Sequence, residues 1–327
     1  MLSKTVKLFF LFCVIVIYTC GNATAAPVPI VVNTVGDDIV VKQAGEFELL
    51  IDKSHGGTIA KYFDLNVDPN KTTNIVVNKS QGSIYHGLHF IMFKQGGGNL
   101  PVPEKWTAQW ETAANMEILH QSSTKVIVHI SGDFHGHLHL PASYDMVYTI
   151  ESDPDTSGAL IYIRSRIIFN SSYANTMQIR EAFGLTGRYG IPGGWYEYSQ
   201  NGAIAPWWTY RQFDDYIGAV INAAHLKTDP LVILHNDWAI ATYLLTIAPP
   251  KTYHYCLMAW VSNKYHNYPA GHIIENKYLV RMDQTNVTSP SSVAAIAEEY
   301  RGSDGGDFIG KPNKSPSLDY LPLLLED

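Results

Sequence analysis

The sequence predicts an all-β protein, built as a large antiparallel β-sandwich with one short helix near the C-terminus. Short runs of β-branched and aromatic residues recur along the chain, and clusters of Gly, Pro, Asn, Asp or Ser separate them. Only one segment, 289–300, has a strong helical pattern. Strands that follow one another without intervening helices pair antiparallel, as they do in sandwiches and barrels.

The first strands are expected at 38–52, where apolar and polar residues alternate on either side of a break at Gly45. Gly56 and Gly57 then predict a hairpin turn into the next strand. Further strands are expected at 73–78, 87–93, 125–140, 144–153, 159–169, 218–223, 231–237, 240–248 and 277–283.

The C-terminal part differs in composition from this strand-rich part. In 289–300, Ser291 or Ser292 can cap a helix that continues through an alanine-rich turn. The segment 301–327 is rich in Gly, Pro and Ser and is expected to be an extended tail. Because no linker interrupts the middle of the chain, 27–300 is predicted to form a single β-sandwich domain.

The first 26 residues, 1–26, have the three parts of a secretory signal peptide. Lys4 and Lys7 supply the positive start, an apolar stretch follows, and Ala23 and Ala25 match the small-residue cleavage pattern. The apolar stretch is short for a membrane span. We therefore expect a secreted, extracellular protein with no membrane association after cleavage. Retention of the segment as an anchor is the alternative.

Composition and charge exclude some classes of protein. The chain has 327 residues, 46% of them hydrophobic and 16% charged, with a net charge of -7. It has no basic cluster that could follow a phosphate backbone, so nucleic-acid binding is not expected. Cys256 is the one cysteine beyond the signal segment, which excludes an intrachain disulfide in the mature chain. N-glycans can attach at the sequons of Asn70, Asn78, Asn170, Asn286 and Asn313.

A row of three histidines is the most unusual local pattern. His135, His137 and His139 occupy alternate positions, so on a strand their imidazoles would share one face. Neutral imidazole is a good ligand for zinc or copper, which makes this histidine row a candidate Zn or Cu site. The row could equally line a polar cleft. His86 and His89 differ in parity, so these two side chains are expected to point in different directions.

The segment 180–216 combines aromatic, amide and charged side chains in a way that a hydrophobic core does not require. Aromatic rings stack on sugar rings, and Arg, Asn and Gln bond to hydroxyls or carboxylates. The glycines of the segment predict loops, which often carry binding residues. The predicted substrate-binding residues are Trp195, Tyr196, Tyr198, Gln200, Asn201, Trp207, Trp208 and Arg211. The alternative for any single tryptophan is that it fills an end of the sandwich and does not contact a ligand.

Three stretches resemble the galactose-mutarotase-like family. They are the strand and Gly-Gly turn in "FELLIDKSHGGTIAKYF", the paired strands in "YDMVYTIESDPDTSGALIYIRSRIIFN", and "LLTIAPPKTYHYCLMAWVSN". The resemblance implies a β-supersandwich, an architecture found in sugar epimerases, polysaccharide lyases and accessory domains of carbohydrate-active enzymes. The aromatic-Asn-Leu phrase that follows the catalytic His of mutarotases is not found here, which puts simple mutarotase activity in doubt.

Cleavage of a uronic-acid-containing glycan by β-elimination is the chemistry that these residue types fit best. A polysaccharide lyase needs a cation to neutralise the uronate, a base for the C5 proton and an acid for the leaving oxygen. Arg180 and Arg188 are predicted for the first role, and His137, His139 or Tyr210 for the others. Tyr can act as the base only if a nearby cation lowers its pKa from about 10.

Alternatives to the lyase remain open. Hydrolysis needs two carboxylates, for which Glu181, Glu197, Asp214 and Asp215 are available. A non-catalytic carbohydrate-binding or cell-surface module would use the same aromatic residues, with a polysaccharide or glycan as its partner. A metal-binding protein would use the histidine row.

Overall fold

The computed structural model describes fifteen ranges of the chain. They are 28–66, 68–72, 74–81, 85–95, 105–134, 140–153, 158–172, 177–187, 190–199, 208–213, 221–227, 231–235, 238–247, 253–261 and 268–282. The predicted signal peptide, C-terminal helix and tail lie outside these residues. In the described part of the chain, no helix is long and apolar enough to cross a membrane.

Strands make up most of the described residues. They are β1 Ile30–Val35, β2 Asp38–Gln43, β3 Phe47–Asp52, β4 Thr58–Asp64, β5 His89–Gln95, β6 Lys105–Ala108, β7 Asn115–Gln121, β8 Lys125–Asp133, β9 Ala142–Ser152, β10 Ala159–Phe169, β11 Met177–Gly187, β12 Gly190–Ser199, β13 Trp208–Phe213, β14 Ile221–Lys227, β15 Leu231–His235, β16 Trp238–Ile247, β17 Tyr253–Val261 and β18 Ile273–Met282. Short 3-10 helices are η1 Lys53–His55, η2 Lys79–Gln81 and η3 Gln109–Glu111.

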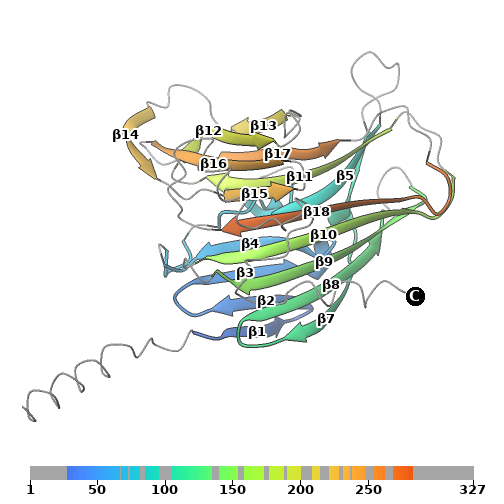
Figure 1. Ribbon diagram of the computed structural model, residues 1–327, viewed down its shortest axis with the longest axis horizontal. Coiled ribbons are helices and arrows are strands. Elements are labelled where there is room, and N and C mark those ends of the chain that lie inside the picture. Colours follow the sequence, from blue (N-terminus) through green and yellow to red (C-terminus); the bar gives the residue numbers. More distant parts are fainter. Residues whose placement is uncertain are drawn as a thin grey trace, which may run out of the picture.

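The strands form three antiparallel sheets. A four-stranded sheet has the order β1-β2-β3-β4, and a five-stranded sheet has the order β13-β17-β11-β5-β6. A nine-stranded sheet has the order β12-β16-β15-β18-β10-β9-β8-β7, with β14 paired to β16. Figure 1 shows β12, β13, β16 and β17 at one end of the molecule and β1 and β7 at the other. The prediction of an all-β antiparallel sandwich is confirmed.

The core lies between the large sheet and the two smaller ones. One buried cluster joins Leu49 of β3, Phe93 of β5 and Tyr148 of β9, so all three sheets contribute to it. Burial alternates along β2 and β3, as the alternating sequence of 38–52 predicts. Each large apolar side chain buried in this way contributes about 1.5–3 kcal/mol.

One predicted strand, 73–78, is not formed by its described residues, 74–78. In 73–78, Val76 makes an isolated bridge rather than part of a strand. The buried side chain of Asn74 takes the place of a ladder: its Oδ1 accepts from Tyr62 N–H at 3.0 Å, and its Nδ2 donates to Ala60 O at 3.2 Å. An asparagine that bonds to backbone groups in this way competes with regular pairing.

The predicted Gly56–Gly57 turn joins β3 to β4 by way of η1, and both glycines have positive φ, 68° and 66°. A Cβ at Gly56 would overlap the Gln109 carbonyl, and one at Gly57 would overlap the Ile130 side chain. Side chains other than hydrogen therefore do not fit. The tight turn brings the end of β3 against η3 and β8, and the candidate site lies there.

Candidate active site

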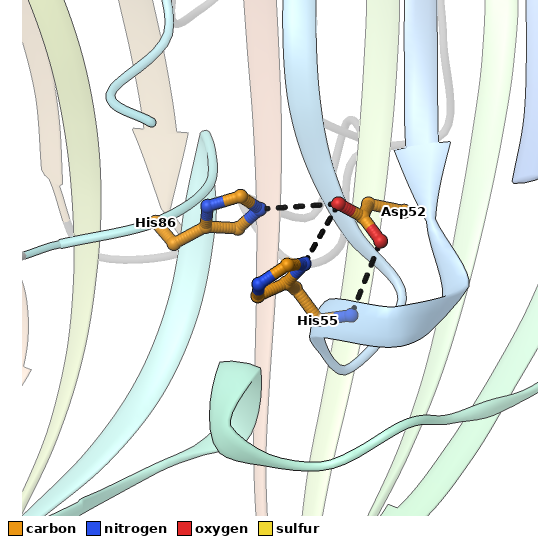
Figure 2. Close-up of side chains that lie close together, drawn as sticks. All are labelled: Asp52, His55 and His86. Carbon is orange, nitrogen blue, oxygen red and sulfur yellow. Dashed lines mark hydrogen bonds and ion pairs between the residues drawn. The ribbon is translucent and has the colours of Figure 1, made fainter. Parts of the chain in front are cut away.

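The sequence Asp52–Lys53–Ser54–His55 builds the first part of the site. Asp52 ends β3 and caps η1: its Oδ1 accepts from His55 N–H at 3.2 Å and from the Ser54 hydroxyl at 2.6 Å. Its second oxygen, Oδ2, lies 2.9 Å from Nδ1 of His55 (Figure 2). A capping aspartate thus holds the imidazole of the last residue of η1.

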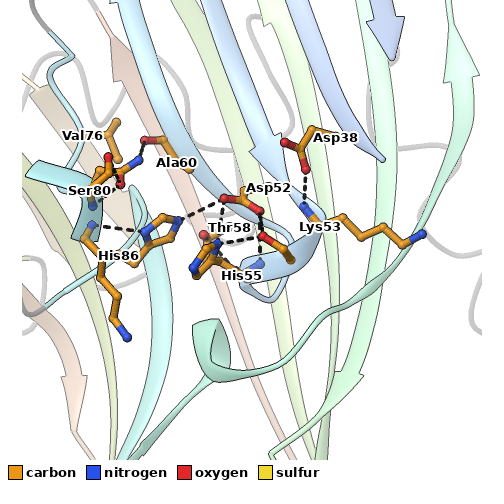
Figure 3. A network of polar contacts seen from close by, with 12 residues as sticks. Asp38, Asp52, Lys53, His55, Thr58, Ala60, Val76, Ser80 and His86 are labelled. Carbon is orange, nitrogen blue, oxygen red and sulfur yellow. Dashed lines mark hydrogen bonds and ion pairs between the residues drawn. The ribbon is translucent and has the colours of Figure 1, made fainter. Parts of the chain in front are cut away.

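His86 completes the cluster from the segment that precedes β5. Its Nε2 lies 3.6 Å from Oδ2 of Asp52, and its side chain is 2% exposed. The rings of His55 and His86 stack, with centroids 4.3 Å apart and planes 26° apart. On the other side of the ring, Lys79 N–H donates to Nδ1 of His86 at 3.3 Å (Figure 3).

These contacts assign the protons of the neutral rings. Because Nδ1 of His86 accepts from Lys79 N–H, its proton is on Nε2 and faces Asp52. His55 carries its proton on Nδ1, toward Asp52, which leaves a lone pair on Nε2. The His55 side chain is 38% exposed, so this cluster presents an open imidazole held by a carboxylate.

Asp52 is ionised in this setting. Burial raises the pKa of its carboxyl, but hydrogen bonds with His86, Ser54 and His55, together with charge attraction to His55, outweigh burial and hold the pKa well below its ordinary value. An ionised carboxylate fixes the tautomer of His55 and stabilises the imidazolium formed when Nε2 takes a proton.

The same atoms form a candidate metal-ligand group. Among the described residues, one ligand atom each from Asp52, His55 and His86 lie within 4.8 Å of one another. A metal ion must lie in the plane of each imidazole that binds it, about 2.0–2.1 Å from the nitrogen. Nearly parallel rings 4.3 Å apart offer no such common point. A ligating histidine also usually donates from its other nitrogen, whereas Nδ1 of His86 accepts. The arrangement therefore suits proton transfer better than metal binding.

A second histidine–carboxylate pair lies inside the sandwich. Oε2 of Glu181, on β11, lies 3.2 Å from Nε2 of His89 and accepts from the Ser165 hydroxyl at 2.8 Å. Oε1 accepts from Nδ2 of Asn276 at 3.0 Å. Glu181 and His89 are both 0% exposed. Glu181, one of the carboxylates considered for hydrolysis, is therefore sealed from any polymer. The different directions predicted for His86 and His89 are confirmed.

Several predicted site residues lie outside the described part of the chain. These are the histidine row (His135, His137 and His139) with Arg188, Gln200, Asn201 and Trp207. Arg180 is described: it lies on β11, pairs in register with Met92 of β5, and is 6% exposed. Its role as a cation for the uronate stays a prediction, and so do the roles of the others.

The aromatic segment contains more strand than predicted. The expected loops of 180–216 are largely the strands β11, β12 and β13. Aromatic-rich runs such as WYEY in β12 and WTYRQF in β13 fit a pleated sheet. The segment is also divided between sheets. Trp195, Tyr196 and Tyr198 belong to β12 of the nine-stranded sheet, whereas Trp208, Tyr210 and Arg211 belong to β13 of the five-stranded sheet.

The structure separates the described sequon asparagines into two kinds. Asn70 and Asn170 are exposed. Asn78 is 6% exposed, and its Nδ2 donates to Ala60 O at 3.2 Å. A glycan fits at the first two positions and not at Asn78, and glycosylation itself stays a prediction.

The sequence interpretation did not include Asp52 and His55 among the candidate site residues. The available signal was the phrase "DKSHGG": an aspartate that can cap the residues after it, with a histidine directly before a tight glycine turn. Its connection with His86, thirty-one positions after His55, depends on tertiary contact.

The chain is weakly similar in structure to several known proteins. No protein-family model matches the chain, and no curated protein matches it in sequence. It is similar to 4-α-glucanotransferase from Thermococcus litoralis at 11% identity and a TM-score of 0.40, over 77% of this chain and 39% of that one. It is also similar to a galactose mutarotase related enzyme from Lactobacillus acidophilus (8% identity, TM-score 0.38, 76% and 98% of the two chains). A galactose mutarotase-like protein from Clostridium acetobutylicum matches at 11% identity and a TM-score of 0.30, over 72% and 98%.

The last two similarities agree with the weak galactose-mutarotase-like resemblance seen in the sequence. At TM-scores of 0.40 and below, none of them bears on the activity of this chain.

Proposed function

We propose that the protein is a secreted carbohydrate-active protein, a polysaccharide lyase that cleaves a uronic-acid-containing glycan by β-elimination with His55 as the base. One observation carries the proposal: the 38% exposed imidazole of His55 is held through Nδ1 by Asp52, at 2.9 Å. This arrangement leaves Nε2 to accept a proton from a bound substrate. An imidazole oriented by a carboxylate is a frequent general base in enzymes.

The proposed reaction proceeds by proton abstraction and elimination. Nε2 of His55 takes the proton from C5 of the uronate, the electron pair of that C–H bond forms the C4=C5 double bond, and the C4–O bond breaks. The leaving oxygen takes a proton from an acid, for which His137, His139 and Tyr210 remain the candidates. Asp52 stabilises the imidazolium that forms, because its own carboxyl is ionised.

The course of β8 supports a connection between the predicted histidine row and His55. β8 ends at Asp133, whose carbonyl accepts from the Thr112 hydroxyl at 3.1 Å. Thr112 directly follows η3, and Gln109 of η3 donates to Gly56 O at 2.7 Å. The last residue of β8 is therefore linked through η3 to the turn that follows His55, which supports the proposal that the row contributes to the same site.

The experiment is a scan of uronate polymers for the ultraviolet absorbance of an unsaturated uronate product. We expect His55→Gln to lower kcat/KM by about 10²–10⁴-fold, the range for loss of a general base. His129→Gln is the matched control, because His129 on β8 is also part-exposed and lies 3.2 Å from an aspartate, Asp145 on β9, in a different sheet from the strands that flank His55.

The control should keep full activity. Equal losses in the two variants would contradict the role of His55. Wild-type protein that yields no unsaturated product from any uronate polymer would contradict the lyase, and retention on those polymers would then favour the non-catalytic binding module. The alternative of Zn or Cu at the histidine row is tested by metal analysis of untagged protein and of a His135→Ala, His137→Ala double variant.

A further inference from the structure

We infer that Lys79 binds the carboxylate of the uronate unit whose C5 proton faces His55. The inference rests on the proposed function and names the group of the substrate that the site recognises. It concerns a residue outside the predicted catalytic set. It is carried by the bond from the Lys79 backbone to His86 and by the position of the Lys79 ammonium over Trp110.

The backbone end of Lys79 is fixed against His86. Its N–H donates to Nδ1 of His86 at 3.3 Å. The preceding residue, Asn78, is buried, and its Oδ1 accepts from both the N–H and the hydroxyl of Ser80 at 2.8 Å. Residues 78–80 therefore form a rigid corner, and the position of Lys79 relative to the stacked imidazoles is set by these bonds.

The ammonium end of Lys79 lies over an aromatic ring on the same side of the cluster. Its Nζ is 5.7 Å from the centroid of the Trp110 ring. Trp110 is 7% exposed and packs edge-on against Phe90, with centroids 4.8 Å apart. Its neighbour Gln109 donates to Gly56 O at 2.7 Å, and Gly56 directly follows His55. The Lys79 side chain thus reaches Trp110 of η3, the short helix whose Gln109 contacts the turn after His55.

The charge of Lys79 is available to a ligand. The residue is exposed, and none of the described carboxylates forms an ion pair with its Nζ. Lys53, another lysine beside the site, differs from Lys79 in its ion pair and in the direction of its side chain. Its Nζ lies 3.7 Å from Asp37, and Figure 3 shows its side chain pointing away from His55 and His86. A cation held over an aromatic face keeps its charge while it loses mobility.

The reaction needs a cation at this place. Removal of the C5 proton puts negative charge on the carboxylate attached to C5, so the group that neutralises the carboxylate must lie beside the base. Lys79, whose backbone is bonded to the His86 ring that stacks on His55, is the lysine proposed to supply that cation. Neutral glycans have no carboxylate for Lys79 to pair with, so the inference also assigns the substrate class: polymers with a carboxylate at C5.

The test measures binding separately from turnover. In a His55→Gln background, calorimetry compares a uronate oligosaccharide with the same oligosaccharide after reduction of its carboxyl groups. We expect Lys79→Gln to weaken binding of the uronate form by about tenfold, the equivalent of one charge-assisted hydrogen bond, and to leave binding of the reduced form unchanged. Lys79→Arg, which retains the charge, should keep most of the affinity. Lys53→Gln should bind as the parent does.

The outcomes separate this inference from the proposed function. Uronate binding that depends on Lys79, in a protein that forms no unsaturated product, would support the inference and contradict the lyase. Equal effects of Lys79→Gln and Lys53→Gln, or equal weakening of the two oligosaccharides, would overturn the inference while lyase activity could stand. Failure of the His55→Gln protein to bind any uronate oligosaccharide would also overturn it.

Discussion

Two of the histidine–carboxylate pairs among the described residues have similar geometry in opposite environments. His89 and Glu181 lie 3.2 Å apart with both side chains 0% exposed. His55 and Asp52 lie 2.9 Å apart, with side chains 38% and 15% exposed. The bond is nearly the same, so the difference between the pairs lies in what surrounds them.

In the sealed pair, the acceptor atoms of the carboxylate are occupied. Glu181 projects from β11 toward the opposite sheet, where Ser165 of β10 and Asn276 of β18 donate to it. Together with His89 of β5, it ties the five-stranded sheet to the nine-stranded sheet through the core. A buried charge without such partners would cost several kcal/mol, so this network serves the fold.

In the open pair, the carboxylate contacts only one of the two nitrogens of the His55 ring. Asp52 is satisfied by Ser54, by His55 and by proximity to His86, yet Nε2 of His55 belongs to a half-exposed ring. The comparison teaches that a histidine–carboxylate pair alone does not identify an active site. The open side of the imidazole distinguishes the candidate site from the structural network.

The largest expected effect is on the sealed pair. Glu181→Ala removes the shared acceptor of three buried donors, so we expect the free energy of unfolding to fall by about 3–5 kcal/mol. Urea unfolding followed by tryptophan fluorescence measures it. Glu117→Ala, on the exposed side of β7, should change stability by less than about 0.5 kcal/mol. If Glu181→Ala does not fold, Glu181→Gln should show an intermediate loss. Equal stability of the Glu181 and Glu117 variants would contradict the structural role of the sealed pair.

The second-largest expected effect is that acid lowers the contribution of the Glu181–His89 pair to stability. Burial raises the pKa of Glu181, but hydrogen bonding and charge attraction from His89, with hydrogen bonds from Asn276 and Ser165, lower it more, so its pKa in the folded chain is below the ordinary value. The unfolded chain therefore binds this proton more tightly, and acid favours unfolding. The contribution is complete above the unfolded-state pKa of about 4.3 and is lost as the pH falls through the lower pKa of the folded state.

The measurement is the difference in unfolding free energy between wild type and Glu181→Gln at a series of pH values. We expect this difference to be constant near neutral pH and to narrow as the pH falls below the ordinary range of glutamate. A difference that does not change with pH would mean that Glu181 is already protonated in the folded chain, and the sealed pair would then be a neutral network.

Much of the fold could be predicted because it follows from local pattern. The alternation in 38–52 and the glycines at 45, 56 and 57 are direct consequences of strand geometry and of φ preference. The strand predicted from the pattern at 73–78 was wrong, because Asn74 satisfies backbone groups that a strand would otherwise pair. Residue type predicts a strand there, and the bonds of one side chain to backbone groups twelve and fourteen positions away compete with it.

The site could be predicted only in part, because its members meet through tertiary contact. The parity of His86 and His89 predicted different directions for the two side chains, although His86 lies just before β5 and not on a strand. The partners themselves, Asp52 and Glu181, are set by how β3 and β11 pack against β5, and no spacing in the sequence encodes that. The described residues of 180–216, where loops were expected, lie in strands, because composition suited to binding is also composition suited to a sheet.

The smallest expected effect is the sharpest test of the comparison. His55→Gln should lower the free energy of unfolding by less than about 1 kcal/mol, because a part-exposed ion pair contributes little to stability, and the N-cap bonds of Asp52 to the backbone and to Ser54 remain. Urea unfolding under the conditions used for Glu181→Ala measures it. A loss as large as that of Glu181→Ala would mean that the Asp52 corner is held together by the imidazole. His55 would then be a structural residue, and the observation that carries the proposed function would have a complete explanation in the fold.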